Sequence, residues 1–138
     1  MPGRLQAVGV ARATWSTYDR PGMSEAMHPF GCELRRRGST VTLILSGELD
    51  ITAVETFRAA LAELASQPLE LLVIDLQALT FVDSTGLRAI VGTQGDALVR
   101  GYGLQIVRGT KQVDEVFRFT RVDSTLPMVE EPPLDAAI

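Results

Sequence analysis

The sequence predicts a single α/β domain in which helices pack on a mixed, mostly parallel β-sheet. Short apolar or alternating runs, typical of strands, are separated by segments whose apolar residues recur every three or four positions, as in helices. These segments follow the order β-β-α-β-α-β-α-β, and a strand, a helix and another strand in succession favour parallel pairing. A chain of 138 residues also has the length for one hydrophobic core.

The first two strands are expected at residues 30–36 and 41–48, as an antiparallel hairpin. Arg37, Gly38 and Ser39 lie between them as turn residues. Apolar residues occupy both faces of the second strand, which indicates a central position in the sheet.

A first helix is expected after Gly47-Glu48-Leu49-Asp50, because Thr52 and Glu55 have the spacing of a capping box. The helix ends near Ser66, before Pro68. Its apolar face consists of Val54, Phe57, Leu61 and Leu64.

Residues 69–76 form an apolar run typical of a strand that is buried on both faces. A second helix starts at Ser84 and stops at Gly101. The remaining elements are a strand at 104–107, a helix capped by Thr110 and a short strand near 126–129.

The domain itself is expected over residues 30–129, between two flexible ends. Residues 1–29 contain prolines and glycines without sustained periodicity, which indicates an arm rather than a packed element. Trp15 and Tyr18 are the aromatic residues of this arm. Residues 130–138 are acidic, contain prolines and are expected to be a flexible tail.

Charge and composition argue against a nucleic-acid partner. Thirteen basic and 17 acidic residues give a net charge of −4. The only basic cluster, residues 35–37, borders a predicted turn and has no interleaved aromatic residues that would follow a phosphate backbone.

Cysteine and histidine content excludes other classes of site. Cys32 is the single cysteine and His28 the single histidine, which excludes an intramolecular disulfide and most metal-ligand constellations. We expect no metal and no cofactor. No apolar run approaches the roughly 20 residues needed to span a bilayer, and no export signal is apparent. A soluble, cytoplasmic protein without membrane association is therefore expected.

Ser84 lacks the surroundings of a catalytic nucleophile. The only histidine, His28, lies in the predicted arm without a supporting acid. Val82 occupies the position where a nucleophile elbow requires glycine.

Other catalytic arrangements are equally weak. Glu48 with Asp50, and Asp75 with Asp83, have the appearance of solvated strand ends. Neither a Walker loop nor a glycine-rich loop that opens a helix is present. The sequence therefore indicates a binding protein rather than an enzyme.

Two interpretations of Ser84 remain open from the residues alone. Asp83 or Ser84 could simply cap the second helix, or the serine could serve chemistry or regulation. A second acidic strand end precedes the first helix at Asp50. If both strands are parallel, the two ends share the edge of the sheet where α/β proteins place functional groups.

Three motifs carry a family resemblance: Gly47-Glu48-Leu49-Asp50, Val73-Ile74-Asp75-Leu76 and Phe81-Val82-Asp83-Ser84-Thr85-Gly86-Leu87. Together they resemble the STAS domain of bacterial anti-sigma factor antagonists over residues 30–128. In that family the first serine of the last motif is phosphorylated by a partner that is both an anti-sigma factor and a serine kinase. The corresponding residue here is Ser84.

The resemblance also implies a partner-binding set. Arg88 departs from the pattern, because the best-known members have glycine there, and this change puts the identity of the kinase in question. The Thr85 hydroxyl is an alternative acceptor, although the motif favours Ser84. The implied set is Asp50, Asp83, Ser84, Thr85, Gly86 and Arg88.

The implied function is a phosphorylation switch. The unmodified protein would bind the anti-sigma factor kinase and release the sigma factor, phosphorylation of Ser84 would block binding, and a serine phosphatase would restore it. Two other classes remain open: a non-phosphorylated STAS adaptor of a lipid-transport ATPase, and a scaffold module of a stress-signalling assembly. A monomer and a weak dimer both fit the sequence.

Overall fold

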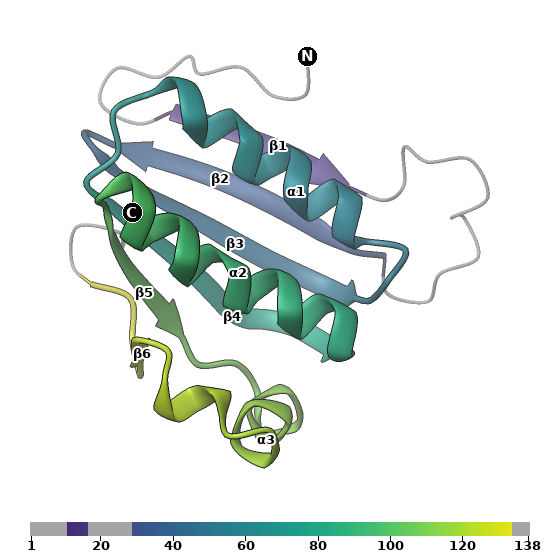
Figure 1. The fold of residues 1–138 in the computed structure, drawn as a ribbon. Coiled ribbons are helices and arrows are strands. Elements are labelled where there is room, and N and C mark those ends of the chain that lie inside the picture. The colour runs from purple at the N-terminus through teal and green to yellow at the C-terminus, as the bar shows by residue number, and fades with distance from the viewer. Residues whose placement is uncertain (1–10, 17–28, 134–138) are drawn as a thin grey trace.

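Six strands form one mixed sheet in the sequential order β1 to β6 in the computed structural model, which describes residues 11–16 and 29–133 (Figure 1). The first two pairings are antiparallel and the remaining three are parallel. This sheet confirms the predicted fold class. The strands are β1 (Ala11–Ser16), β2 (Gly31–Arg37), β3 (Thr40–Leu49), β4 (Leu71–Val82), β5 (Gly103–Val107) and β6 (Met128–Val129).

Helices α1 (Val54–Glu63) and α2 (Ser84–Arg100) lie side by side across one face of the sheet (Figure 1). Helix α3 (Lys111–Phe119) packs beside β4, near the β6 side of the sheet. Two short 3₁₀ turns, Leu64–Ser66 and Val122–Ser124, follow α1 and α3. None of the helices in the described part of the chain is long and apolar enough to cross a membrane.

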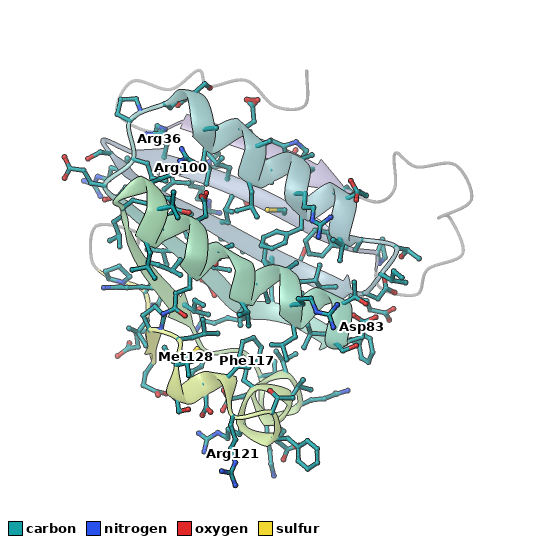
Figure 2. All side chains as sticks on the ribbon, in the orientation of Figure 1. Arg36, Asp83, Arg100, Phe117, Arg121 and Met128 are labelled. Atoms are coloured by element: carbon teal, nitrogen blue, oxygen red, sulfur yellow. The ribbon has the colours of Figure 1, made fainter. Side chains whose placement is uncertain are left out.

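The main core lies between the helices and the sheet face that they cover. Alternate residues of the strands point into it, and Phe57 of α1 meets Phe30 edge to face with ring centroids 6.4 Å apart. Phe117 of α3 is fully buried in the same core (Figure 2). On the other sheet face, Val73 and Val107 are also fully buried. The central strands are therefore buried on both sides, as their apolar runs predict.

The predicted ends of α2 and α3 are largely confirmed. Gly101 ends α2 in the left-handed conformation at φ 82°, which glycine adopts at low cost. The Thr110 hydroxyl accepts a 3.5 Å hydrogen bond from the Val113 amide and so caps α3. The β2–β3 turn is also where expected, because Arg36 donates to the Gly38 carbonyl there.

The flexible arm predicted for residues 1–29 is wrong for residues 11–16. Those residues form β1, and Trp15 is 6% exposed opposite Cys32 of β2. The strand was missed because only alternate residues of a six-residue edge strand contact the core, which is too short a run for periodicity. Tyr18 lies outside the described residues.

The tail predicted for residues 130–138 is anchored at its first residue. Glu130 accepts a 2.9 Å hydrogen bond from Arg108, at the end of β5. Residues 134–138 lie outside the described part of the chain.

The capping box predicted for α1 is also wrong. The N-cap is Ala53, which makes no side-chain hydrogen bond. Thr52 instead donates from its hydroxyl and its amide to Asp50, at 2.6 and 3.0 Å. The spacing to Glu55 matched, but the helix starts one residue later than a cap at Thr52 requires.

Strand β4 is longer than the apolar run that predicted it. It continues to Val82 and pairs with the end of β3, with register shifts after Ile44 and Gly47. The extension was missed because several of its residues are exposed, so that it lacks a continuous apolar pattern.

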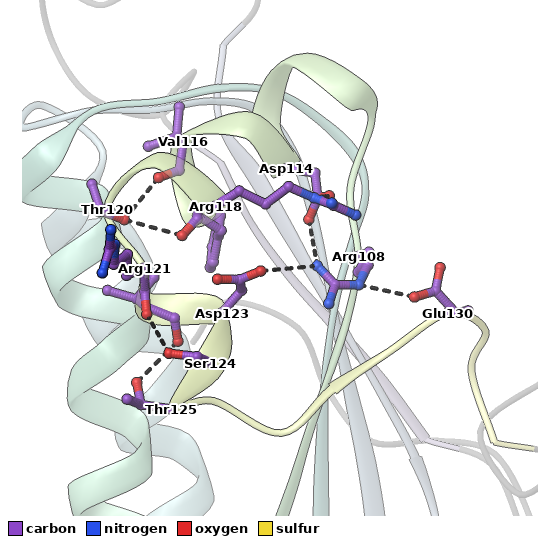
Figure 3. A network of polar contacts seen from close by, with 12 residues as sticks. Arg108, Asp114, Val116, Arg118, Thr120, Arg121, Asp123, Ser124, Thr125 and Glu130 are labelled. Carbon is purple, nitrogen blue, oxygen red and sulfur yellow. Dashed lines mark hydrogen bonds and ion pairs between the residues drawn. The ribbon is translucent and has the colours of Figure 1, made fainter.

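An ion-pair network joins β5 to the elements that follow it (Figure 3). Arg108 contacts Asp114 and Glu130 at 2.9 Å each and Asp123 at 3.8 Å, while Arg118 contacts Asp114 at 2.7 Å. Burial alone would raise the pKa of Asp114, but hydrogen bonds from both arginines and their charges outweigh it and hold that pKa below its usual range. Hydrogen bonding to Asp114 in turn raises the pKa of Arg108.

Candidate functional site

The candidate site lies where β3 and β4 end side by side. Leu49 and Val82 are register partners in the parallel pair, so Asp50 and Asp83 follow neighbouring strand ends. The Asp83 amide donates to the Leu49 carbonyl at 3.2 Å, and the Ile51 amide donates to Oδ2 of Asp83 at 3.2 Å. The expectation that the two acidic strand ends share one edge of the sheet is confirmed.

Asp83 caps α2. Its backbone is extended at φ −102° and ψ −176°, and its Oδ1 accepts a 2.8 Å hydrogen bond from the Gly86 amide. This is N-cap geometry, in which a side-chain oxygen satisfies an amide of the first helical turn. Figure 2 shows Asp83 at the start of the helix. The sequence did not decide whether Asp83 or Ser84 caps the helix, and the structure shows that the cap is Asp83.

Because Asp83 supplies the cap, the Ser84 hydroxyl is not needed to start the helix. It is the first residue of α2, its side chain is exposed, and its hydroxyl makes no hydrogen bond with any described residue. Thr85 is half-buried, which makes its hydroxyl less accessible to a partner. Ser84 is thus the motif hydroxyl that a second protein reaches most easily.

Gly86 and Leu87 hold the start of α2 against the sheet. A methyl group at Gly86 would overlap the carbonyl oxygen of Leu49 and lie 2.8 Å from its Cγ. Leu87 is 6% exposed and belongs to the main core. Gly86 is therefore a position of close backbone approach, and Leu87 is a core residue.

Asp50 and Arg88 flank the serine differently. Asp50 is half-buried, and its Oδ1 is held by the Thr52 amide and hydroxyl. Arg88 is exposed on α2, and its guanidinium has no ion-pair partner in the described segments. The site therefore combines two hydrogen-bonded carboxylates, Asp50 and Asp83, with an exposed cation one helical turn after Ser84.

Two apolar residues at this edge were not singled out from the sequence. Ile51 is 69% exposed and Phe81 is 41% exposed. Phe81 borders an open hollow of about 450 Å³ together with Glu48, Thr80 and Gln112. Phe81 belongs to the serine motif, and that motif could have identified it as a surface residue of the site. For Ile51 the sequence offers only its position directly after Asp50.

No base contacts Ser84 among the described residues, and His28 lies outside them. No group of three metal-ligating side chains occurs within residues 11–16 and 29–133.

Comparisons with known proteins agree with this fold. A family model described as "Mlab, STAS domain" matches residues 32–130. The structure is similar to that of an anti-sigma factor antagonist from Mycobacterium paratuberculosis, with 25% identity and a TM-score of 0.65 over 75% of this chain and 86% of that chain. No curated protein sequence matches the chain.

Two structures of the anti-sigma factor antagonist SpoIIAA share the fold. The unphosphorylated form has 24% identity and a TM-score of 0.63 over 73% of this chain and 88% of that chain. The phosphorylated form, a Bacillus cell fate determinant, has 23% identity and a TM-score of 0.58 over 73% and 91%.

Proposed function

The chain belongs to the STAS domain family, and we propose that it is an anti-sigma factor antagonist controlled by phosphorylation of Ser84. The observation that carries this proposal is the exposed, unbonded Ser84 hydroxyl beside a cap that Asp83 already supplies. The similar structure from Mycobacterium paratuberculosis supports it, since that protein is an anti-sigma factor antagonist.

The partner is an anti-sigma factor with serine kinase activity. Unmodified protein binds it and thereby releases the sigma factor. The kinase then transfers the γ-phosphoryl group of ATP to Oγ of Ser84, the hydroxyl proton passes to a base of the kinase, and ADP leaves. In the active site of a serine phosphatase, water attacks the phosphorus atom, the bond to Oγ of Ser84 breaks, inorganic phosphate leaves and the hydroxyl is regenerated.

Phosphorylation changes the surface without disturbing the fold. It adds about −1.5 to −2 charge units at a small, neutral, exposed position. The helix N-terminus tolerates an anion. The carboxylates of Asp83 and Asp50 keep their hydrogen bonds to Gly86, Ile51 and Thr52, and their negative charge adds to that of the phosphate. A contact that accepts a neutral serine loses affinity.

The partner surface centres on Ser84. Asp50 and Arg88 differ in charge and are positioned to set partner choice, while Ile51 and Phe81 supply exposed apolar area. Gly86 is buried, so it positions the surface rather than contacting the partner.

The test is to incubate the protein with ATP and candidate anti-sigma factor kinases and to locate any phosphate by mass spectrometry. We expect modification of wild type and of Thr85→Val, and none of Ser84→Ala. Phosphate on Ser84→Ala, or unmodified wild type with every cognate kinase, would overturn the proposal.

A binding measurement completes the test. Ser84→Asp should weaken binding of the kinase at least tenfold. Ser66→Asp adds the same charge at the exposed end of the turn after α1 and should bind as wild type does. Equal affinity of Ser84→Asp and wild type would contradict the switch.

The second candidate is a non-phosphorylated STAS adaptor. The matched family model is described as "Mlab, STAS domain" rather than as an anti-sigma factor antagonist, and this description favours the adaptor as the alternative function. An adaptor would bind its partner in the unmodified state and would acquire no phosphate in the kinase experiment.

A further inference from the structure

Arg88 and Ser84 lie one helical turn apart on α2, and both side chains are exposed. Residues four apart on a helix are neighbours on its surface, with about 5–6 Å between their Cβ atoms. An acidic group that precedes a basic one at this spacing has the favourable orientation. Arg88 is therefore the cation closest in sequence and helical phase to the Ser84 hydroxyl.

Among the cationic side chains near the start of α2, Arg88 is the one available to an anion at Ser84. The Gly86 and Ile51 amides are already bonded to Asp83. From α1, Arg58 lines the same hollow as Arg88 but pairs with Glu55 at 3.6 Å. Arg88 has no such acid among the residues that the structure describes.

We infer that Arg88 binds the phosphate of phosphorylated Ser84 within the same chain. The inference rests on the proposed function for its biological role, because it concerns the phosphorylated state of that site. A guanidinium offers two parallel N–H donors that match two phosphate oxygens, so the pair combines charge with directed hydrogen bonds. The phosphate is then held along the surface of α2.

This contact has a regulatory consequence. Arg88 offsets part of the repulsion between the phosphate and the carboxylates of Asp83 and Asp50. A phosphatase must also displace the guanidinium before it can reach the phosphorus atom. Arg88 thus prolongs the phosphorylated state, which is the state that does not bind the kinase.

The contact can be measured without any kinase. Phosphoserine is incorporated at position 84 during translation, and the second pKa of the phosphate is followed by ³¹P NMR during a pH titration. An adjacent cation favours the dianion, so we expect this pKa to be about 0.2 to 0.4 unit lower in wild type than in Arg88→Gln. Arg88→Lys should retain part of the shift, because it keeps the charge and loses the paired donors.

Arg37→Gln is the matched control. It removes the same charge from the exposed last residue of β2, which pairs with Thr40 at the start of β3, whereas the site follows the end of β3. In this variant the phosphate on Ser84 should have the same second pKa as in the wild-type protein. An identical phosphate pKa in wild type and Arg88→Gln, or an equal change in Arg37→Gln, would overturn the inference.

The two proposals fail separately. If no kinase modifies Ser84, the switch is wrong, although the titration still reports the contact. If a kinase modifies Ser84 but the titration shows no dependence on Arg88, the switch stands and the intramolecular contact is wrong.

Discussion

The Gly86 amide donates a 2.8 Å hydrogen bond to Oδ1 of Asp83, and this bond separates two roles within one motif. Asp83 caps α2, so the neighbouring Ser84 hydroxyl is left without a structural task. A residue that does not stabilise the fold can be modified without unfolding it. The cap and the proposed phosphate acceptor are therefore adjacent but independent.

Replacement of Asp83 should destabilise the protein, whereas replacement of Ser84 should not. Asp83→Ala removes the cap and the acceptor of the Ile51 amide, and should lower the free energy of unfolding by about 1 to 2 kcal/mol. Ser84→Ala should stay within about 0.5 kcal/mol of wild type. Urea denaturation of both variants measures this, and an equal loss in both would contradict the assignment of the cap.

Two glycines of α2 should respond in opposite directions to alanine. Gly86→Ala pushes a methyl group into the Leu49 backbone and should cost about 1 to 3 kcal/mol. Gly92 has open space around its Cβ position, so Gly92→Ala should stabilise by about 0.5 to 1 kcal/mol through helix propensity. Chemical denaturation compares the two, and a stable Gly86→Ala variant would refute the close approach.

The Asp114 carboxylate should make stability depend on acid pH. Because its pKa is lowered in the folded state, its contribution is present above the unfolded pKa of about 3.9 and is lost as pH falls through the folded value. Asp114→Asn should lower the free energy of unfolding by about 1 to 3 kcal/mol at pH 7, and the difference from wild type should shrink below about pH 4.

The control for that variant is Glu55→Gln. Glu55 pairs with Arg58 at 3.6 Å on the exposed surface of α1, so its loss should change stability little at any pH. A pH-independent difference between wild type and Asp114→Asn would contradict the role of the ion pairs.

Cys32 should be protected from thiol reagents in the folded protein. Burial, with a smaller effect from Glu33, raises the pKa of this thiol, and thiolates are the reactive form. At pH 8 its labelling should be at least 100-fold slower than in denaturant. Trp15→Ala loosens β1, which pairs Trp15 with Cys32, and should speed labelling. Equal rates in wild type and Trp15→Ala would argue that β1 does not cover the thiol.

Phe81 should contribute to partner binding rather than to stability. It is 41% exposed beside the serine motif, so Phe81→Ser should weaken binding of the cognate kinase several-fold while the melting temperature changes little. Phe119→Ser, at a 90% exposed position of α3, serves as a comparison and should bind as wild type does. Calorimetry and thermal unfolding measure both properties. If the two variants bound the kinase with equal affinity, Phe81 would not be part of the proposed partner-binding surface.

The sequence determined the elements whose signals are local. Apolar periodicity predicted α1 and α2, the glycine at 101 predicted the end of α2, and the apolar run at 69–76 predicted a strand buried on both faces. The parallel strand order followed from the succession of these elements. The serine motif at the start of α2 and the family resemblance were equally visible, since they depend on short contiguous stretches.

Only the tertiary structure decided features that depend on contacts between distant residues. Trp15 lies in a strand because β2 is beside it, and β4 continues to Val82 because β3 pairs with its exposed end. Asp83 rather than Ser84 caps α2 because Asp83 also accepts from Ile51, 32 residues away in sequence. Local patterns report the preferences of a segment, whereas hydrogen bonds across the fold choose among partners that the sequence leaves equivalent.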